Sequence, residues 1–148
     1  MNPIGTINDI LSTKGNQVWT ISPESTVFDA IEMMAEKNIG ALLVTEHNKL
    51  IGILSERDYT RKVALKGKVS KQTLVREIIS GQVISVTPNH TVEECMHLMT
   101  DHRIRHLPVV EDGQIVGVIS IGDLVNWIIT AQTATISQLQ TYISGVPV

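Results

Sequence analysis

Cysteine is almost absent from this chain of 148 residues, and Cys95 is its single example. One cysteine excludes a disulfide within the chain, which favours a reducing compartment. The sequence also lacks an excess of basic residues, because its net charge is −3 at pH 7. This charge gives no support to binding of nucleic acid or of an anionic membrane surface.

Long hydrophobic runs are missing as well. No apolar stretch approaches the roughly 20 residues that span a bilayer. The N-terminal residues lack the basic region and apolar core of a signal peptide. We therefore expect a cytoplasmic protein without a membrane partner. The hydrophobic content of 43% is nevertheless typical of a folded, globular chain.

A long internal repeat is the main feature that the sequence does contain. The segment Gly52–Asp58 returns 65 positions later as Gly117–Asp123, and the offset holds without a gap back to Val18 and Val83. Chance would give about one identity in fifteen positions, far fewer than are found. The identical pairs include Pro23/Pro88, Thr26/Thr91, Met34/Met99, Leu42/Leu107, Val44/Val109, Gly52/Gly117, Ser55/Ser120 and Asp58/Asp123. The repeat indicates a duplicated structural unit.

Each copy has the pattern strand, helix, two strands, helix, which predicts a mixed α/β (α+β) fold. Two such copies are expected to pack about a pseudo-twofold axis, with a short helix before them and a long C-terminal helix after them. The strands are expected at 18–21, 41–45, 50–54, 83–86, 106–110 and 115–119. The helices are expected at 6–12, from 26 through 34, at 55–65, 73–79 and 91–102, and from 120 to about 144. The predicted domain bounds are 1–12, 13–72, 73–134 and 135–148.

A hydroxyl and a carboxylate recur at each strand-to-helix junction, as Ser55 with Asp58 and as Ser120 with Asp123. The simplest interpretation is a capping box, in which serine and acid satisfy the helix start. A second interpretation is a ligand site. A carboxylate at such a junction can accept both hydrogen bonds of a vicinal diol such as ribose, and helix N–H groups favour phosphate. Both interpretations stay open at this point.

These motifs resemble a tandem pair of CBS (cystathionine β-synthase) domains, also called a Bateman module. The resemblance covers nearly the whole chain. Its carriers are Ser22-Pro23, Thr87-Pro88, the segment Arg105–Val110 and the two Gly-x-x-Ser-x-x-Asp motifs. Glu-Arg-Asp-Tyr followed by Arg-Lys is similar to small stand-alone CBS pairs of bacteria and plants.

The resemblance implies adenine-nucleotide binding in two clefts between the repeats. Ser55 and Asp58 would hold one ribose, and Ser120 and Asp123 the other. Apolar residues would contact the adenine, and basic residues before Leu-Pro would reach the phosphates. The implied further residues are Ile21 and Ile53 in the first cleft, Val86 and Val118 in the second, and Gly40, Ala41, Arg57, Arg105, His106 and Pro108 around the phosphates.

The two copies differ where phosphate would bind. Arg105 and His106 align with Gly40 and Ala41, while Arg57 aligns with Gly122. If each cleft takes its phosphate ligands from the opposite repeat, only the Asp58 cleft receives a cation. We therefore expect this cleft to take the charged phosphate chain, and the Asp123 cleft to bind more weakly or to take an uncharged adenosine moiety.

Other candidate sites carry less chemistry. The basic run Arg61, Lys62, Lys66, Lys68 and Lys71 is either a solvated face or a source of phosphate contacts. The histidines near Cys95 do not form a zinc motif, so we expect no metal. Cys95 aligns with Ala30 on a core face and is expected to be buried. No nucleophile–base set is found, so we expect no catalytic residues.

The sequence thus favours a regulatory, energy-sensing module that binds AMP, ATP or NAD and needs no catalytic cofactor. Binding would shift the angle between the repeats, and an unknown regulated protein would respond to it. A homodimer is expected, with the C-terminal helix as the dimer face. The alternatives are a nucleotide-hydrolysing enzyme and a structural interaction module with vestigial clefts.

Overall fold

The computed structural model describes residues 5–79 and 82–144. Its contacts divide the chain into two units, which we name after their aspartates. The Asp58 unit comprises Gln17–Ser85 and Asp112–Val116, and the Asp123 unit comprises Met1–Asn16, Val86–Glu111 and Gly117–Val148. The expected mixed α+β class is confirmed. The predicted domain bounds at 12, 72 and 134 stay a prediction.

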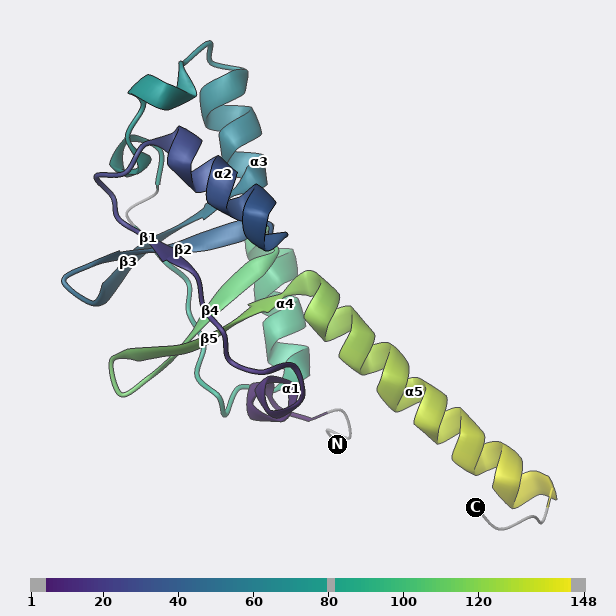
Figure 1. Ribbon diagram of the computed structural model, residues 1–148. Coiled ribbons are helices and arrows are strands. Elements are labelled where there is room, and N and C mark those ends of the chain that lie inside the picture. The colour runs from purple at the N-terminus through teal and green to yellow at the C-terminus, as the bar shows by residue number, and fades with distance from the viewer. Residues whose placement is uncertain (1–4, 80–81, 145–148) are drawn as a thin grey trace. The chain divides into compact units, whose positions relative to one another are not determined.

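A three-stranded sheet forms the centre of the Asp58 unit (Figure 1). Its order is β1-β2-β3, with β1 parallel and β3 antiparallel to β2. His47 and Asn48 both have positive φ at the β2–β3 turn, as a two-residue hairpin that follows the strand twist requires. The elements are β1 (Thr20–Ile21), α2 (Val27–Lys37), β2 (Ala41–Glu46), β3 (Lys49–Ser55), α3 (Glu56–Tyr59), a π-helical turn (Thr60–Ala64) and two 3₁₀ turns (Ser70–Gln72 and Val75–Glu77).

The Asp123 unit is built around the hairpin of β4 and β5, whose turn residues Asp112 and Gly113 also have positive φ. The first residues of β5, up to Val116, group with the Asp58 unit. Figure 1 shows α5 continuing far beyond the other helices of its own unit. The elements are α1 (Ile7–Lys14), α4 (Val92–His102), β4 (His106–Glu111), β5 (Gln114–Ser120) and α5 (Ile121–Ser144).

The strand expected at 83–86 is wrong, because only an isolated bridge between Val86 and Val109 forms there. Proline explains the loss. In the first copy the N–H of Leu43 donates to the Trp19 carbonyl at 3.2 Å. The residue equivalent to Leu43 is Pro108, which has no N–H to donate. The parallel strand pair of the first copy therefore shrinks to one bridge in the second.

Two helix expectations need correction. The segment 73–79 forms a 3₁₀ turn at Val75–Glu77 instead of an α-helix, and the helix expected at 55–65 changes to a π-helical turn at Thr60. The last helix is continuous through Ser144. The structure describes the side chains of this helix only at residues 121–133 and 140. Ile136, Leu139 and Ile143, which were expected to keep the helical spacing, therefore lie outside the described side chains.

The segments before the two repeats also correspond in their backbone contacts, at a different offset. Thr6–Leu11 corresponds to Leu74–Ile79, 68 positions on. The N–H of Ile7 donates to the His90 carbonyl at 2.9 Å, and the N–H of Val75 donates to the Ser25 carbonyl at 2.8 Å. The segment preceding one copy thus completes the other copy: α1 belongs to the Asp123 unit, and residues 74–79 belong to the Asp58 unit.

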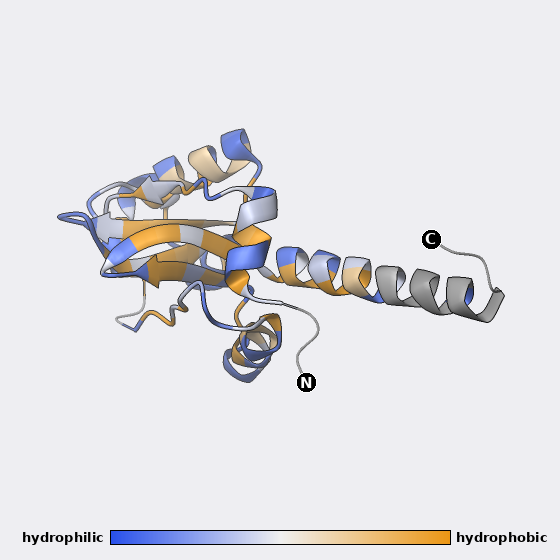
Figure 2. Ribbon diagram, turned by 90° about the horizontal axis from the view of Figure 1, so that it is seen from below, coloured by the Kyte–Doolittle hydropathy of each residue, from blue (hydrophilic) through white to orange (hydrophobic). Residues whose placement is uncertain are grey.

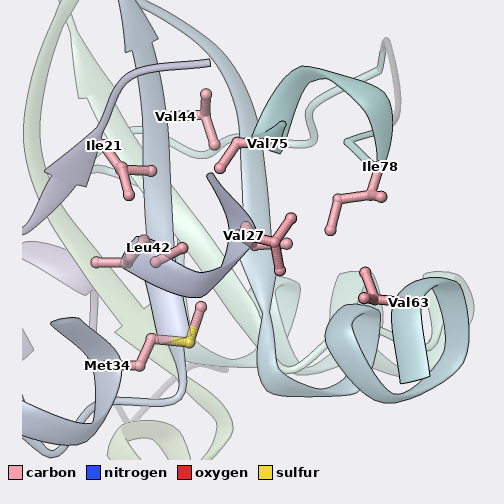
Figure 3. Close-up of a cluster of buried hydrophobic side chains, with 10 residues drawn as sticks. Ile21, Val27, Met34, Leu42, Val44, Val63, Val75 and Ile78 are labelled. Atoms are coloured by element: carbon pink, nitrogen blue, oxygen red, sulfur yellow. The ribbon is translucent and has the colours of Figure 1, made fainter. Parts of the chain in front are cut away.

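Both cores use equivalent positions. In Figure 3, Val75 and Ile78 point into the cluster that also contains Val27 and Val44. Their equivalents in the Asp123 unit, Ile7 and Ile10, are 0% and 3% exposed. Figure 2 shows the strands as largely apolar ribbons. The remaining buried pairs are Ile21/Val86, Val27/Val92, Ala30/Cys95, Met34/Met99, Leu42/Leu107, Val44/Val109 and Leu54/Ile119. Burial of these equivalent apolar faces is the main stabilising contribution to each unit.

Candidate functional site

The Asp58 corner is the junction of β3 and α3. The Asp58 Oδ2 atom accepts hydrogen bonds from the Ser55 N–H at 2.8 Å and from the Ser55 hydroxyl at 3.0 Å. The Asp58 N–H donates to Ser55 Oγ at 3.2 Å. The ammonium of Lys62, one helical turn later, lies 3.5 Å from the other oxygen, Oδ1, and donates to the Ile78 carbonyl at 3.0 Å. The carboxylate is half-buried at 27% exposure.

The Asp123 corner, between β5 and α5, repeats the serine–aspartate geometry. Its Oδ2 atom accepts from the Ser120 N–H at 2.8 Å, and the Asp123 N–H donates to Ser120 Oγ at 3.1 Å. Here the cation is Lys14 of α1, whose Nζ donates to Asp123 Oδ2 at 2.7 Å and to the Val118 carbonyl at 3.0 Å. The Asp123 side chain is 23% exposed.

The capping-box interpretation is confirmed at both corners by these reciprocal bonds. The helix starts are further anchored, since Glu56 N–H donates to the Gly40 carbonyl and Ile121 N–H to the Arg105 carbonyl. Two of the first three helix N–H groups are therefore already used, which leaves less of the helix start for phosphate. The carboxylates, in contrast to these N–H groups, remain partly available to a ligand. The cap uses only the Oδ2 atom of each carboxylate.

The two lysines at the corners were not identified from the sequence as partners of the aspartates. The sequence spacing could have identified Lys62 as a partner of Asp58, because a lysine four residues after an aspartate lies on the same helix face. Lys14 had no such indication. It lies 109 positions from Asp123 and precedes the stretch in which the 65-residue offset holds.

The other predicted ligand residues fall into two groups. Those that belong to the buried cores are Ile21, Val86 and Pro108. Those that are half-buried or exposed are Ile53, Val118, Arg57, Gly40, Ala41, Arg105 and His106. The carbonyls of Gly40 and Arg105 are each bonded to the helix start in their own unit. The predicted pairing of Arg105 and His106 with Asp58 joins residues of different units and stays a prediction.

Three residues of the predicted basic run line a cavity of about 350 Å³ in the Asp58 unit. Lys62, Lys66 and Lys68 surround it together with Glu77, Ile78 and Ile79. Lys62 therefore contacts both the cavity and the carboxylate of Asp58. The Glu77 carboxylate accepts a hydrogen bond from the Leu74 N–H at 2.7 Å, so one of its oxygens is bonded to the backbone three residues earlier.

Cys95 is fully buried in α4, as its alignment with Ala30 predicts. Burial, and secondarily the neighbouring charge of Glu94, raises the pKa of the Cys95 thiol to about 11. Within residues 5–79 and 82–144, no group of three or more His, Cys, Asp or Glu side chains is placed to hold a metal ion. In the same part of the chain, no helix is both long and apolar enough to cross a membrane.

Comparisons with known proteins agree with this architecture. The CBS domain family model matches residues 7–65 and 75–130. The mitochondrial CBS domain-containing protein CBSX3 of Arabidopsis thaliana is 39% identical over 95% of this chain and 72% of its own. A putative signal-transduction protein with CBS domains from Burkholderia ambifaria is 48% identical, with a TM-score of 0.82 over 84% of this chain and 94% of its own.

A third neighbour carries ligands. The CBS domain pair of protein MJ0100, solved with 5′-methylthioadenosine and S-adenosyl-L-methionine, is 25% identical, with a TM-score of 0.72 over 83% of this chain and 94% of its own. The family match spans most of the chain in two segments. The chain therefore belongs to the CBS domain family and is a CBS-domain pair, a regulatory module.

Proposed function

We propose that this CBS pair binds adenosine-containing ligands, namely AMP, ATP or NAD, at the Asp58 and Asp123 corners and transmits the bound state to a protein partner. The ligands of the MJ0100 pair support this class, because methylthioadenosine and S-adenosylmethionine both contain an adenosine group. The module would sense the level of such a ligand without converting it.

One observation carries the proposal: both capping carboxylates keep an oxygen that the cap does not use. At Asp58 the cap engages Oδ2, while Oδ1 lies 3.5 Å from the ammonium of Lys62. At Asp123 the cap again engages Oδ2. A cap alone requires one acceptor oxygen. The carboxylate side chains are partly exposed at both corners, and the second oxygen of each is suited to accept from the hydroxyls of a ribose.

Replacement of each aspartate by asparagine separates the cap from the ligand site. In Asp58→Asn and Asp123→Asn the amide oxygen still accepts the serine N–H, while an NH₂ group replaces the outward acceptor. The matched control is Asp112→Asn, at an exposed turn residue with φ 52°, a conformation that asparagine adopts readily.

Titration calorimetry with AMP measures the affinity of each variant. We expect each corner variant to lose about tenfold to a hundredfold in affinity at its own site, because a charge-assisted hydrogen bond is replaced by a repulsive donor pair. The Asp112→Asn control should bind as the wild type does. Unchanged binding in both corner variants would contradict the proposal.

A thermal-shift panel of AMP, ADP, ATP, NAD and S-adenosylmethionine then identifies the preferred ligand, since a ligand that binds only the folded state raises the Tm. No shift with any of them would favour the structural alternative with vestigial clefts. Product formation after incubation with ATP would favour the hydrolase alternative.

Three finer features belong to the same proposal. The first is a homodimer through α5, for which light scattering is the test. The second is phosphate binding by Arg105 and His106 at the Asp58 site, which Arg105→Gln should weaken for AMP more than for adenosine. The third is a cytoplasmic location, which fluorescence microscopy of a tagged chain would check, given that the Arabidopsis relative is named mitochondrial.

A further inference from the structure

The last residue of α1 places a positive charge inside the Asp123 corner. Lys14 is followed by Gly15, whose φ of 92° ends the helix. Its ammonium donates to Asp123 Oδ2 at 2.7 Å and to the Val118 carbonyl at 3.0 Å. A lysine ammonium has three N–H donors, so these two bonds leave one donor for a further acceptor. The residues it contacts are those expected to meet the ribose and the base of a ligand.

The Asp58 corner obtains its lysine in another way. Lys62 follows Asp58 by one helical turn and lies 3.5 Å from Oδ1, a looser pair than the one made by Lys14. The position equivalent to Lys62 is Trp127, and the position equivalent to Lys14 is Gln82. The cation at each corner is therefore not a product of the duplication. Each unit acquired its own lysine, from a different element, beside the same carboxylate.

Resting on the proposed function, we propose that Lys14 is the residue that sets ligand selectivity at the Asp123 corner. Without ligand, its ammonium pairs with Asp123. When ribose hydroxyls bind the other oxygen, Oδ1, the ammonium turns from Oδ2 to a phosphate of the same ligand. The corner therefore selects a nucleotide over the nucleoside that lacks phosphate.

The energetics favour this exchange for an anionic ligand. The pair is partly exposed, at 33% for Lys14 and 23% for Asp123, so breaking it costs little. A phosphate oxygen offers the displaced ammonium a charge-assisted bond in return. Adenosine offers no such acceptor, so the ammonium gains no bond when adenosine binds. The long, flexible lysine stem permits the movement without a change in α1.

This assignment differs from the expectation that the Asp123 site prefers an uncharged adenosine moiety. That expectation came from Gly40 and Ala41, which align with Arg105 and His106. The comparison of the two copies did not include Lys14, because the gapless repeat begins at Val18. The structure supplies the cation that the alignment of the copies lacks.

The test compares AMP with adenosine by titration calorimetry in a full-length Asp58→Asn background, which isolates the Asp123 corner. The variants are Lys14→Met, which keeps the apolar stem, and Lys14→Arg, which keeps the charge. The matched control is Lys49→Met, at an exposed lysine at the start of β3. Thermal melts of all variants establish that they are folded.

We expect the ratio of AMP to adenosine affinity to fall about tenfold in Lys14→Met, as the loss of a charge-assisted bond predicts. Lys14→Arg should retain most of the preference, and Lys49→Met all of it. A ratio of AMP to adenosine affinity in Lys14→Met equal to that of the Lys49→Met control would overturn the role of Lys14 and leave the proposed function standing. Failure of the wild type to bind either ligand would instead overturn the proposed function and the assignment with it.

Discussion

The two units bury equivalent side chains, yet they hold their aspartates with lysines from different elements. Core pairs such as Val27/Val92 and Met34/Met99 are all at most 2% exposed. Lys62 reaches Asp58 from the π-helical turn that continues α3, whereas Lys14 reaches Asp123 from α1. Packing constrains a core at every position, while a half-exposed corner tolerates different partners. The difference indicates that the duplicated fold was kept while the charged partners of the two aspartates diverged.

The largest expected effect tests whether α1 is part of the Asp123 unit in the way that residues 74–79 are part of the other. Ile7 is 0% exposed. Ile7→Ala should lower the free energy of unfolding by about 2–5 kcal/mol, because it leaves a cavity in the core. Urea denaturation measures this loss. Leu65→Ala, at a side chain 76% exposed, is the control. An Ile7→Ala effect as small as the control's would show that α1 is a dispensable tail.

A smaller effect should distinguish two equivalent glycines. A Cβ on Gly52 would lie 2.9 Å from Ile79 Cδ1 and 3.2 Å from its Cβ, which cannot rotate away. A Cβ on Gly117 would lie 2.7 Å from Leu11 Cδ2, the flexible end of a side chain. Gly52→Ala should therefore destabilise by about 1–3 kcal/mol, and Gly117→Ala by less. Thermal or urea unfolding compares them, and the reverse order would refute this view of the two contacts.

Cys95 and its counterpart Ala30 give a chemical comparison. The raised pKa of about 11 leaves the Cys95 thiol protonated at neutral pH, and the side chain is 0% exposed. Iodoacetamide should therefore label the native protein far more slowly than the urea-unfolded protein, since only an accessible thiolate reacts. Mass spectrometry follows the reaction. Equal rates in the two states would mean that the α4 core opens readily.

The smallest expected effect concerns the starts of α2 and α4. Thr91 and Glu94 cap α4 reciprocally, and the Thr91 N–H lowers the pKa of Glu94 from its ordinary 4.5. A lowered folded pKa gives a stabilisation that is present above pH 4.5 and is lost as the pH falls through the folded value. Glu94→Gln should thus flatten the fall of Tm below pH 4.5.

The equivalent start of α2 provides the control. There Thr26 Oγ accepts from the N–H of Asp29 at 3.1 Å. Asp29→Asn should change the fall of Tm below pH 4.5 less than Glu94→Gln does. Identical acid slopes for the wild type and Glu94→Gln would contradict the capping role of the Glu94 charge.

The repeat allowed most of the fold to be predicted from the sequence, together with the serine–aspartate corners. The failures have local physical causes. Pro108 removes an N–H donor, so the strand expected at 83–86 reduces to one bridge. The segments 6–11 and 74–79 make equivalent backbone contacts at an offset of 68 instead of 65, so a gapless comparison of the sequence missed that they complete opposite copies. The contact of Lys14 with Asp123 depends on that arrangement and was invisible to residue spacing.

The central claim is that the two capped aspartates are ligand sites. An NMR titration of the ¹⁵N-labelled chain with AMP tests it most directly, because it reports on every backbone N–H at once. The claim predicts that the largest shifts fall on the amides of Ser55, Asp58, Ser120 and Asp123, with those of Lys14 and Gly15 following. Saturable shifts at other positions, with these amides unmoved, would contradict it.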